Sequence, residues 1–207
     1  MHEAKDAVAE PEVRQNRHMV PGWRPAESRA HRRGQRGDPA GAAVAFARMV
    51  ADQQRVLGPD HPRVLSARHY AAYWRGEAGD AAGAAAAFAA LLTDRVRVLG
   101  PYHRDTLATR HNLAVWRGKA GDAAGAFAAF TELLTDQQIA LGPNHPDVLL
   151  THNYIAKWRG ELGDAAGAAV AFAELLPHMV RVYGAGHPDT LAAQANLAYW
   201  RRRSSTS

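Results

Sequence analysis

The chain has 207 residues, of which 47% are hydrophobic, and it contains no cysteine. That hydrophobic share can bury a core, and the lack of cysteine excludes disulfides, thiolate metal sites and cysteine nucleophiles. The net charge of +5 comes from the ends, because residues 1–37 carry +3, residues 38–200 carry −1, and Arg201, Arg202 and Arg203 add +3. A nucleic-acid binder more typically carries a basic stripe along its folded surface, so a nucleic-acid adaptor is an alternative that rests only on the basic ends.

Residues 1–27 match nothing in the rest of the chain and hold Pro11, Pro21 and Pro25, so we expect them to be disordered. We favour a degraded repeat with a loose tail here over a basic tether. No apolar run reaches the roughly 18 residues that span a bilayer, and the first 30 residues carry charges and prolines throughout. We therefore expect no membrane span and no signal peptide, and we expect a cytoplasmic protein.

From Leu57 onward the chain repeats itself every 42 residues. Glycine, histidine and tryptophan each recur at that step: Gly58, Gly100, Gly142 and Gly184; His61, His103, His145 and His187; Trp74, Trp116, Trp158 and Trp200. We interpret residues 28–57 as a degenerate first repeat. Three complete repeats follow at 58–99, 100–141 and 142–183, and the chain ends with a half repeat and a short polar tail at 184–207. A fixed period of this length indicates a solenoid whose units bury their apolar faces against their neighbours.

Each unit predicts two helices. A proline after the histidine suits the first turn of the first helix, and a glycine followed by aspartate ends that helix and caps the next. We expect helices over residues 62–77, 80–98, 104–119, 122–140, 146–161, 164–182 and 188–202, with Trp116 and Phe130 buried. Gly83, Gly125 and Gly167 fall inside the second helices, which predicts a close approach by a neighbouring helix. No strand-like alternation occurs, so the fold class is all-α.

No catalytic or metal site follows from the repeat. One histidine per unit, with units roughly 10 Å apart, cannot converge on one ion, so the four in-phase histidines read as turn and helix-start residues. No Ser-His-Asp arrangement, paired carboxylates or phosphate-binding glycine loop can be argued, and we expect neither an enzyme nor a cofactor.

The pattern of Asn112, Leu113 and Ala114, followed by Gly121, Ala126 and Phe130, resembles the tetratricopeptide repeat. The 42-residue period resembles the kinesin-light-chain subtype. The amino-acid sequence of the repeat is similar to arrays in actinobacterial regulatory proteins. The resemblance implies a tetratricopeptide-repeat α-solenoid of antiparallel helix pairs that acts as a protein–protein interaction module, regulatory or scaffolding. One departure is that arginine follows each tryptophan where the family often has tyrosine.

The resemblance also implies that the first helices line a concave groove that binds a peptide or protein segment. The residues that it assigns to peptide binding are Tyr70, Arg110, His111, Asn112, Asn153, Tyr154, Lys157 and Asn196. Amides can donate to and accept from a peptide backbone, and the aromatic and cationic groups suit an extended, partly acidic segment. The alternative interpretation is that these residues lie on solvated helix faces and bind no peptide.

The last half repeat leaves Leu191, Leu197 and Trp200 on a helix without a second partner. Exposed apolar patches often mark an interface, so we expect self-association through residues 188–202, or a chain that is a piece of a longer protein. A self-associating or autoinhibitory segment of a larger regulatory protein is therefore the alternative function.

Overall fold

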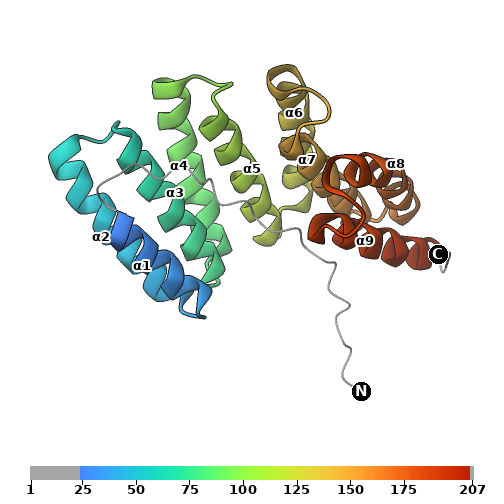
Figure 1. The fold of residues 1–207 in the computed structure, drawn as a ribbon, viewed down its shortest axis with the longest axis horizontal. Helices are drawn as coiled ribbons and strands as arrows, with labels where there is room; N and C mark the ends of the chain where they lie inside the picture. Colours follow the sequence, from blue (N-terminus) through green and yellow to red (C-terminus); the bar gives the residue numbers. More distant parts are fainter. Residues whose placement is uncertain (1–23, 206–207) are drawn as a thin grey trace. The chain divides into compact units, whose positions relative to one another are not determined.

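The computed structural model describes residues 24–205, and every regular element among them is an α-helix (Figure 1). The nine described helices are α1 (Arg24–Gln35), α2 (Pro39–Leu57), α3 (Pro62–Glu77), α4 (Ala81–Leu99), α5 (Arg104–Lys119), α6 (Ala123–Leu141), α7 (Pro146–Glu161), α8 (Ala165–Tyr183) and α9 (Pro188–Ser204). The all-α prediction is confirmed. The bounds predicted for α3, α5 and α7 agree at both ends, α4, α6 and α8 each begin and end one residue later than predicted, and α9 ends two residues later.

The described helices fall into two compact units, an N-terminal unit that ends at Asp122 and a C-terminal unit that begins at Ala123. In the N-terminal unit each of α1 to α5 packs against the next, and in the C-terminal unit each of α6 to α9 does so. Ion pairs show that α3 and α4 are antiparallel. Arg75 pairs with Asp80 beside the connecting turn, Arg68 with Asp94 in mid-helix, and Arg97 with Asp60 at the far end.

Histidine starts the odd-numbered helices from α3 onward, as predicted. The Nδ1 atom of His61 accepts a hydrogen bond from the backbone N–H of Arg63. In the same way, each of the other three histidines accepts from the backbone N–H of the residue two positions later: His103, His145 and His187. Asp80 caps α4 by accepting from the backbone N–H of Gly83. These caps satisfy N–H groups that have no partner within the helix, which explains why the bounds could be predicted closely.

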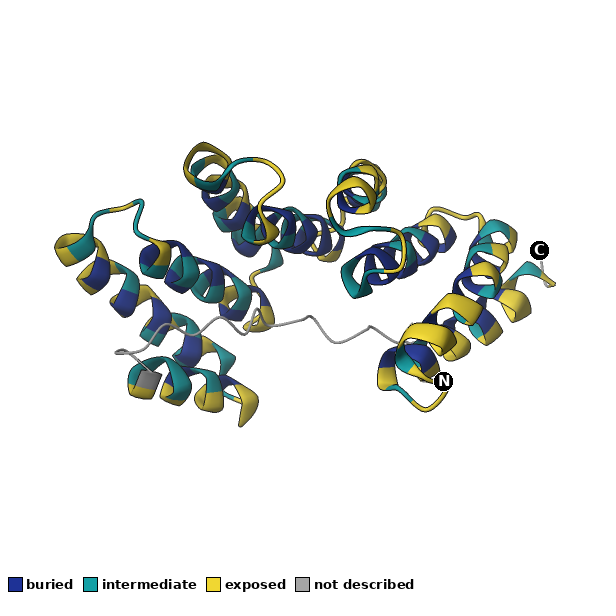
Figure 2. Cartoon of the chain, turned by 45° about the horizontal axis from the view of Figure 1, so that its top comes forward, coloured by how far each residue is buried: buried dark blue, intermediate teal, exposed yellow. Residues whose placement is uncertain are grey.

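The cores are built around the in-phase phenylalanines of the second helices. Phe46 and Phe88 in the N-terminal unit, and Phe130 and Phe172 in the C-terminal unit, are all 0% exposed. The burial of Trp116 and Phe130 is confirmed. Buried residues lie where the helices of each unit face one another (Figure 2).

Glycines within the first helices receive the tryptophan ring of the next first helix. A Cβ on Gly76 would stand 2.5 Å from the ring of Trp116, and one on Gly160 would stand 2.6 Å from Trp200. Each tryptophan therefore packs on the Trp-Arg-Gly segment of the preceding first helix.

The close approach predicted at Gly83 and Gly167 is made by an arginine side chain of the neighbouring first helix, together with the capping aspartate. At Gly83 the space for a Cβ is filled by Arg75 of the preceding helix and by Asp80, the N-cap of α4, and at Gly167 it is filled by Arg159 of α7 and by the N-cap Asp164. The arginine that follows the repeat tryptophan thus forms an ion pair over the start of the next helix (2.6 Å in both cases).

Both ends of the described chain depart from the expectations. α1 begins at Arg24, so residues 24–27, expected to be disordered, form its first turn; the rest of that expectation falls on residues 1–23, outside the described part. In α9, Trp200 is 1% exposed and Leu197 is 8% exposed, because both join the core of α7 and α8. The expected apolar end face is therefore reduced to Leu191, which is 51% exposed.

By length and composition, one helix in the described part of the chain, α8, is apolar enough to cross a membrane. Core helices of soluble proteins pass the same test, so the observation is a weak indication. Within its unit α8 packs against α7 and α9.

Candidate functional site

The eight residues predicted to bind a peptide lie on four first helices: α3, α5, α7 and α9. Tyr70 and Arg110 are half-buried. The other six are buried, with exposures of 7% or less: His111, Asn112, Asn153, Tyr154, Lys157 and Asn196. Their side chains are therefore not solvated faces, and whether they bind a peptide stays a prediction.

The two predicted tyrosines pack on the phenylalanine of the preceding second helix. Tyr154 stacks on Phe130, with ring centroids 4.9 Å apart and an angle of 11° between the planes. The ring centroids of Tyr70 and Phe46 are 5.3 Å apart, and the His31 ring packs edge-on against the Tyr70 ring with centroids 4.3 Å apart. Burial raises the pKa of Tyr70 to about 12. Both rings have a packing role whether or not they contact a ligand.

The predicted asparagines differ in how they are satisfied. Asn112 donates from Nδ2 to the carbonyl oxygen of Ala108 at 2.9 Å, a bond within its own helix. Asn153 is 1% exposed, and neither its Oδ1 nor its Nδ2 has a hydrogen-bond partner among the described residues. A buried amide without partners is costly, which makes Asn153 the member of the predicted set that most needs an explanation.

Lys157 brings a buried ammonium group to the predicted set. Its Nζ lies 5.1 Å from the ring centroid of Trp158, a cation–π distance, and the side chain is 6% exposed. Lys157 and Asn153 are four residues apart on α7 and so share one face of that helix. This α7 face is the best-defined part of the predicted site within one unit.

Sequence reasoning missed a buried polar position in the second helices. It holds Gln53, Arg95, Gln137 and Met179, in phase with the repeat, and the position that it faces on the next first helix holds Ala67, Thr109, Thr151 or Ala193. Arg95 donates to Thr109 Oγ1 at 2.6 Å and to the carbonyl oxygen of Asp105 at 2.8 Å. Thr151 donates to Gln137 Oε1 at 2.7 Å. Gln53 meets alanine at this step, and neither of its amide atoms has a partner in the described chain.

Burial also perturbs histidines in the N-terminal unit. Burial lowers the pKa of His69 to about 3, with the charge of Arg95 acting in the same direction, and burial lowers the pKa of His31 to about 4. The Nδ1 atom of His31 accepts a hydrogen bond from Trp74 Nε1 at 3.3 Å. Both histidines are therefore neutral members of an aromatic core at neutral pH.

A cleft of about 310 Å³ lies among α6, α7 and α8, and the sequence did not predict it. Its polar lining is Gln138, Asn144, His152, Glu174 and His178. The equivalent positions near α3 and α4 form a chain of ion pairs that joins Asp60, Arg97, Asp94 and Arg68. Here Asn144 and His178 replace both carboxylates, and Arg181 bonds to these neutral groups instead.

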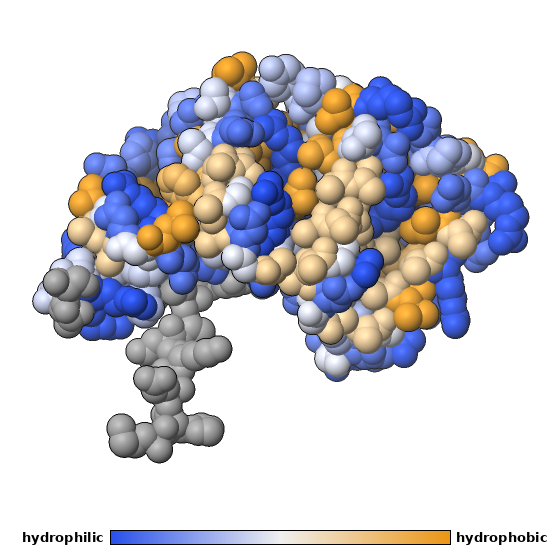
Figure 3. All heavy atoms as spheres, turned by 180° about the vertical axis from the view of Figure 1, so that it is seen from behind, coloured by the Kyte–Doolittle hydropathy of each residue, from blue (hydrophilic) through white to orange (hydrophobic). Residues whose placement is uncertain are grey.

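A second cleft, of about 470 Å³, lies among α2, α3 and α4 and is lined mainly by alanine and valine. Seen from behind, small weakly hydrophobic residues appear in patches between hydrophilic side chains (Figure 3). Among residues 24–205 no three histidine or carboxylate side chains are grouped as metal ligands would be.

Comparison with known proteins identifies the fold. A family model described as "Tetratricopeptide repeat" matches residues 34–63 and 106–147. The fold is that of tetratricopeptide repeats. No curated protein matches the sequence.

Solved structures agree with this assignment. A crystal structure of kinesin light chain nearly identical TPR-like repeats from Podosopora anserina matches with a TM-score of 0.74 at 22% identity, covering 89% of this chain and 87% of that one. A variant of the same protein gives a TM-score of 0.75 at 22% identity, with coverage of 91% and 90%. The crystal structure of BtubC (BKLC) from P. vanneervenii matches with a TM-score of 0.71 at 16% identity, covering 88% of this chain and 72% of that one. At these identities the likeness shows the fold alone, a kinesin-light-chain-like arrangement of consecutive helix pairs.

Proposed function

We propose that this tetratricopeptide-repeat chain is a protein–protein interaction module, with a regulatory or scaffolding role, that binds a peptide or protein segment along its first helices. Such repeats generally serve as non-catalytic scaffolds that bind proteins or peptides. We further propose a cytoplasmic location, which is consistent with a chain that has no cysteine.

The observation that carries the proposal is Asn153. Its buried, unpartnered carboxamide could both donate to and accept from a peptide backbone. Lys157, on the same face of α7, adds a cation that suits an acidic side chain or a carboxylate of the segment. A bound segment would thus remove the cost of an unsatisfied amide, which gives the binding a driving force that the free chain lacks.

The test compares two substitutions of polar amides. Partners are first captured with the full chain and identified by mass spectrometry, and affinities are then measured by calorimetry. Asn153→Ala should weaken the partner by about 1–3 kcal/mol, which is about 5- to 150-fold, while the melting temperature is unchanged or higher.

The matched control is Gln54→Ala on the exposed surface of α2, which should leave affinity unchanged. If Asn153→Ala lowers the melting temperature while affinity holds, Asn153 is a structural residue and the proposed site is wrong. The alternative, a self-associating segment, is less favoured because Leu197 and Trp200 are buried within their own unit.

A further inference from the structure

α1 has two faces with opposite roles. One face packs inside the N-terminal unit: Ala30 is 3% exposed, the ring of Trp74 fills the space beside Gly34, and His31 accepts from Trp74 Nε1. These contacts fix the orientation of the helix. The other face is therefore held toward solvent.

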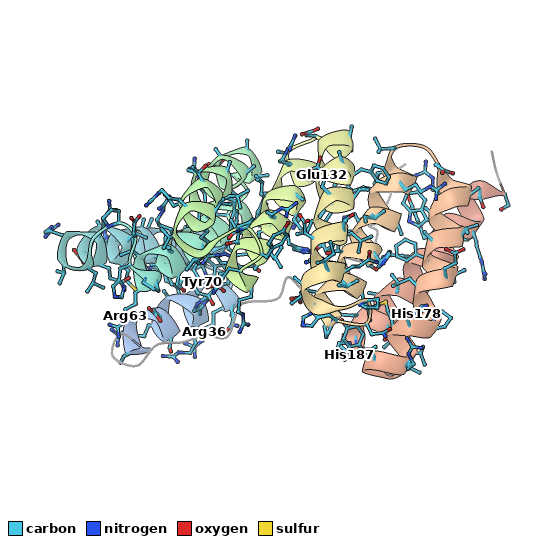
Figure 4. All side chains as sticks on the ribbon, turned by 90° about the horizontal axis from the view of Figure 1, so that it is seen from above. Arg36, Arg63, Tyr70, Glu132, His178 and His187 are labelled. Atoms are coloured by element: carbon cyan, nitrogen blue, oxygen red, sulfur yellow. The ribbon has the colours of Figure 1, made fainter. Side chains whose placement is uncertain are left out.

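The exposed face carries Arg29, Arg32 and Arg36. They are three and four residues apart, and because the backbone N–H of Arg36 donates to the carbonyl oxygen of Arg32 at 3.1 Å, the helical spacing continues to Arg36. The three guanidinium groups thus form one stripe about 10 Å long, which we call the α1 arginine stripe. Figure 4 labels Arg36 beside the C-terminal end of this helix.

The stripe has no counter-charge in the described chain. Arg33, next to it, pairs with Asp38, whereas no hydrogen bond or ion pair joins the guanidinium group of Arg29, Arg32 or Arg36 to a described residue. The acid within α1, Glu27, is half-buried, and burial raises its pKa. Like charges at these spacings destabilise a helix, and the described residues do not compensate that cost.

Comparison with the later repeats shows which face this is. Arg32 stands in phase with Trp74 and Trp116, and Arg36 with Ala78. Trp116 and Trp74 pack on the preceding first helix, so the α1 arginine stripe occupies the face that joins one repeat to another. A polar end cap needs hydrophilic residues there, but it does not need three charges of one sign.

We propose that the α1 arginine stripe docks an acidic segment of a partner protein, with carboxylates at helical spacing that pair with the three guanidinium groups. Each arginine presents a planar fork of donors that matches a carboxylate. The stripe shares no residue with the α7 face, and the inference does not depend on the proposed function of that face.

Two other anionic partners fit less well. A nucleic acid would engage basic residues over a longer surface, and residues 38–200 carry a net charge of −1. A membrane-surface helix inserts its apolar face, and the apolar face of α1 is already packed within its unit. An acidic protein segment needs only the short stripe that the structure presents.

The test uses the full chain and a defined probe. The probe is a fluorescein-labelled, alanine-based helical peptide of about 20 residues with Glu on one face, and its control has Gln at the same positions. Anisotropy at low and moderate salt gives the Kd. The wild-type chain should bind the Glu peptide, with affinity that falls as salt rises, and should not bind the Gln peptide.

The decisive variants remove equal charge from different places. Arg29→Gln, Arg32→Gln and Arg36→Gln together should weaken the Glu peptide at least about tenfold. The matched triple, Arg48→Gln, Arg55→Gln and Arg201→Gln, takes exposed arginines elsewhere and should change Kd less than about twofold. Circular dichroism and melting check that both triples keep the wild-type helicity.

Several outcomes of these binding measurements would overturn the proposal. These are no binding by the wild-type chain, equal weakening by both triples, tighter binding to a DNA or RNA duplex than to the peptide, and tighter binding to phosphatidylserine vesicles than to the peptide. The chain's own acidic residues are tested by changing Glu3, Asp6, Glu10 and Glu12 to Gln. A rise in peptide affinity of more than about tenfold in that variant would assign the stripe to the N-terminal segment of this chain instead.

Discussion

At the scale of single residues, the buried polar position in the second helices shows how each repeat adapts to its own neighbours. Arg95 and Gln137 face threonines and bond to them, and Met179 faces alanine without need of a bond. Gln53 is polar like Arg95 and Gln137, but the facing residue is alanine, as it is opposite Met179. Its amide is 0% exposed and has no hydrogen-bond partner among the described residues. The stability of this position thus depends on a pair of residues, not on either one.

Gln53→Met should therefore stabilise the N-terminal unit. It copies the pairing of Met179 with Ala193 and removes a buried amide without partners, a change worth about 1–3 kcal/mol. The same substitution at Gln137 should destabilise by about 0.5–1.5 kcal/mol, because it removes the acceptor used by Thr151. Chemical denaturation of both variants measures the two signs, and a loss of stability in both would contradict the pairing argument.

His69 should make the N-terminal unit sensitive to acid. Its pKa is lowered to about 3 by burial, so below pH 6.5 the unfolded chain binds a proton that the folded chain does not. The free energy of unfolding should fall as the pH drops from about 6.5 toward 3. His69→Asn, which introduces the residue that the later repeat carries as Asn153, should reduce the loss of melting temperature between pH 7.5 and 5.

The control for that experiment is His103→Asn, which changes an exposed histidine at a helix start that asparagine also caps well. It should keep the wild-type dependence on pH. If His69→Asn and the wild type lose the same melting temperature on acidification, other groups control the acid sensitivity.

At the scale of helices, the contact between a tryptophan and a glycine joins successive first helices within a unit. Trp116 on α5 packs on Gly76 of α3, and Trp200 on α9 packs on Gly160 of α7. Because the indole ring covers the glycine directly, the two helices can approach more closely than a side chain would allow. The Arg-Gly pair that follows each of the earlier tryptophans thus has two functions, since the arginine closes the next cap and the glycine receives the next tryptophan.

Gly76→Ala should test this contact. Alanine favours a helix interior over glycine, but its Cβ would stand 2.5 Å from the Trp116 ring, and such overpacking typically costs about 1–3 kcal/mol. Gly186→Ala is the matched control, because nothing lies within 4 Å of a Cβ there and it should be close to neutral. Equal melting temperatures for the two variants would argue against a tight contact between Trp116 and Gly76.

At the scale of the whole molecule, each unit is stable through contacts between consecutive helices. The core of the C-terminal unit includes Phe172, Leu197 and Trp200, so α9 is held by α7 and α8 although no second helix of its own repeat follows among the described residues. In such arrays the loss of one interface propagates to its neighbours.

Phe130→Ala should accordingly cost about 3–5 kcal/mol, since Phe130 is 0% exposed and stacks on Tyr154. Phe127→Ala, a half-buried position one turn earlier on the same helix, should cost clearly less. Hydrogen exchange should show the loss of protection reaching α7. Protection lost in α6 alone would mean that α7 is stable without it.

The sequence by itself determined the helices, their bounds and the family of folds. Those features depend on local signals, such as a histidine or aspartate that caps, a glycine that ends a helix, and the 42-residue period that repeats them. The four in-phase phenylalanines also identified the core, since one large apolar residue per second helix has few other places to lie.

Only the tertiary structure decided which polar residues of the first helices are covered. The sequence predicted Asn112, Asn153 and Asn196 on a groove-lining face, with a solvated face as the alternative, yet all three are buried, because burial depends on the helices that pack beside them. The role of Gly76 was also out of reach, as its partner Trp116 belongs to the next repeat. Contacts of this kind depend on how repeats stack in space, and the chemistry of one repeat does not contain that information.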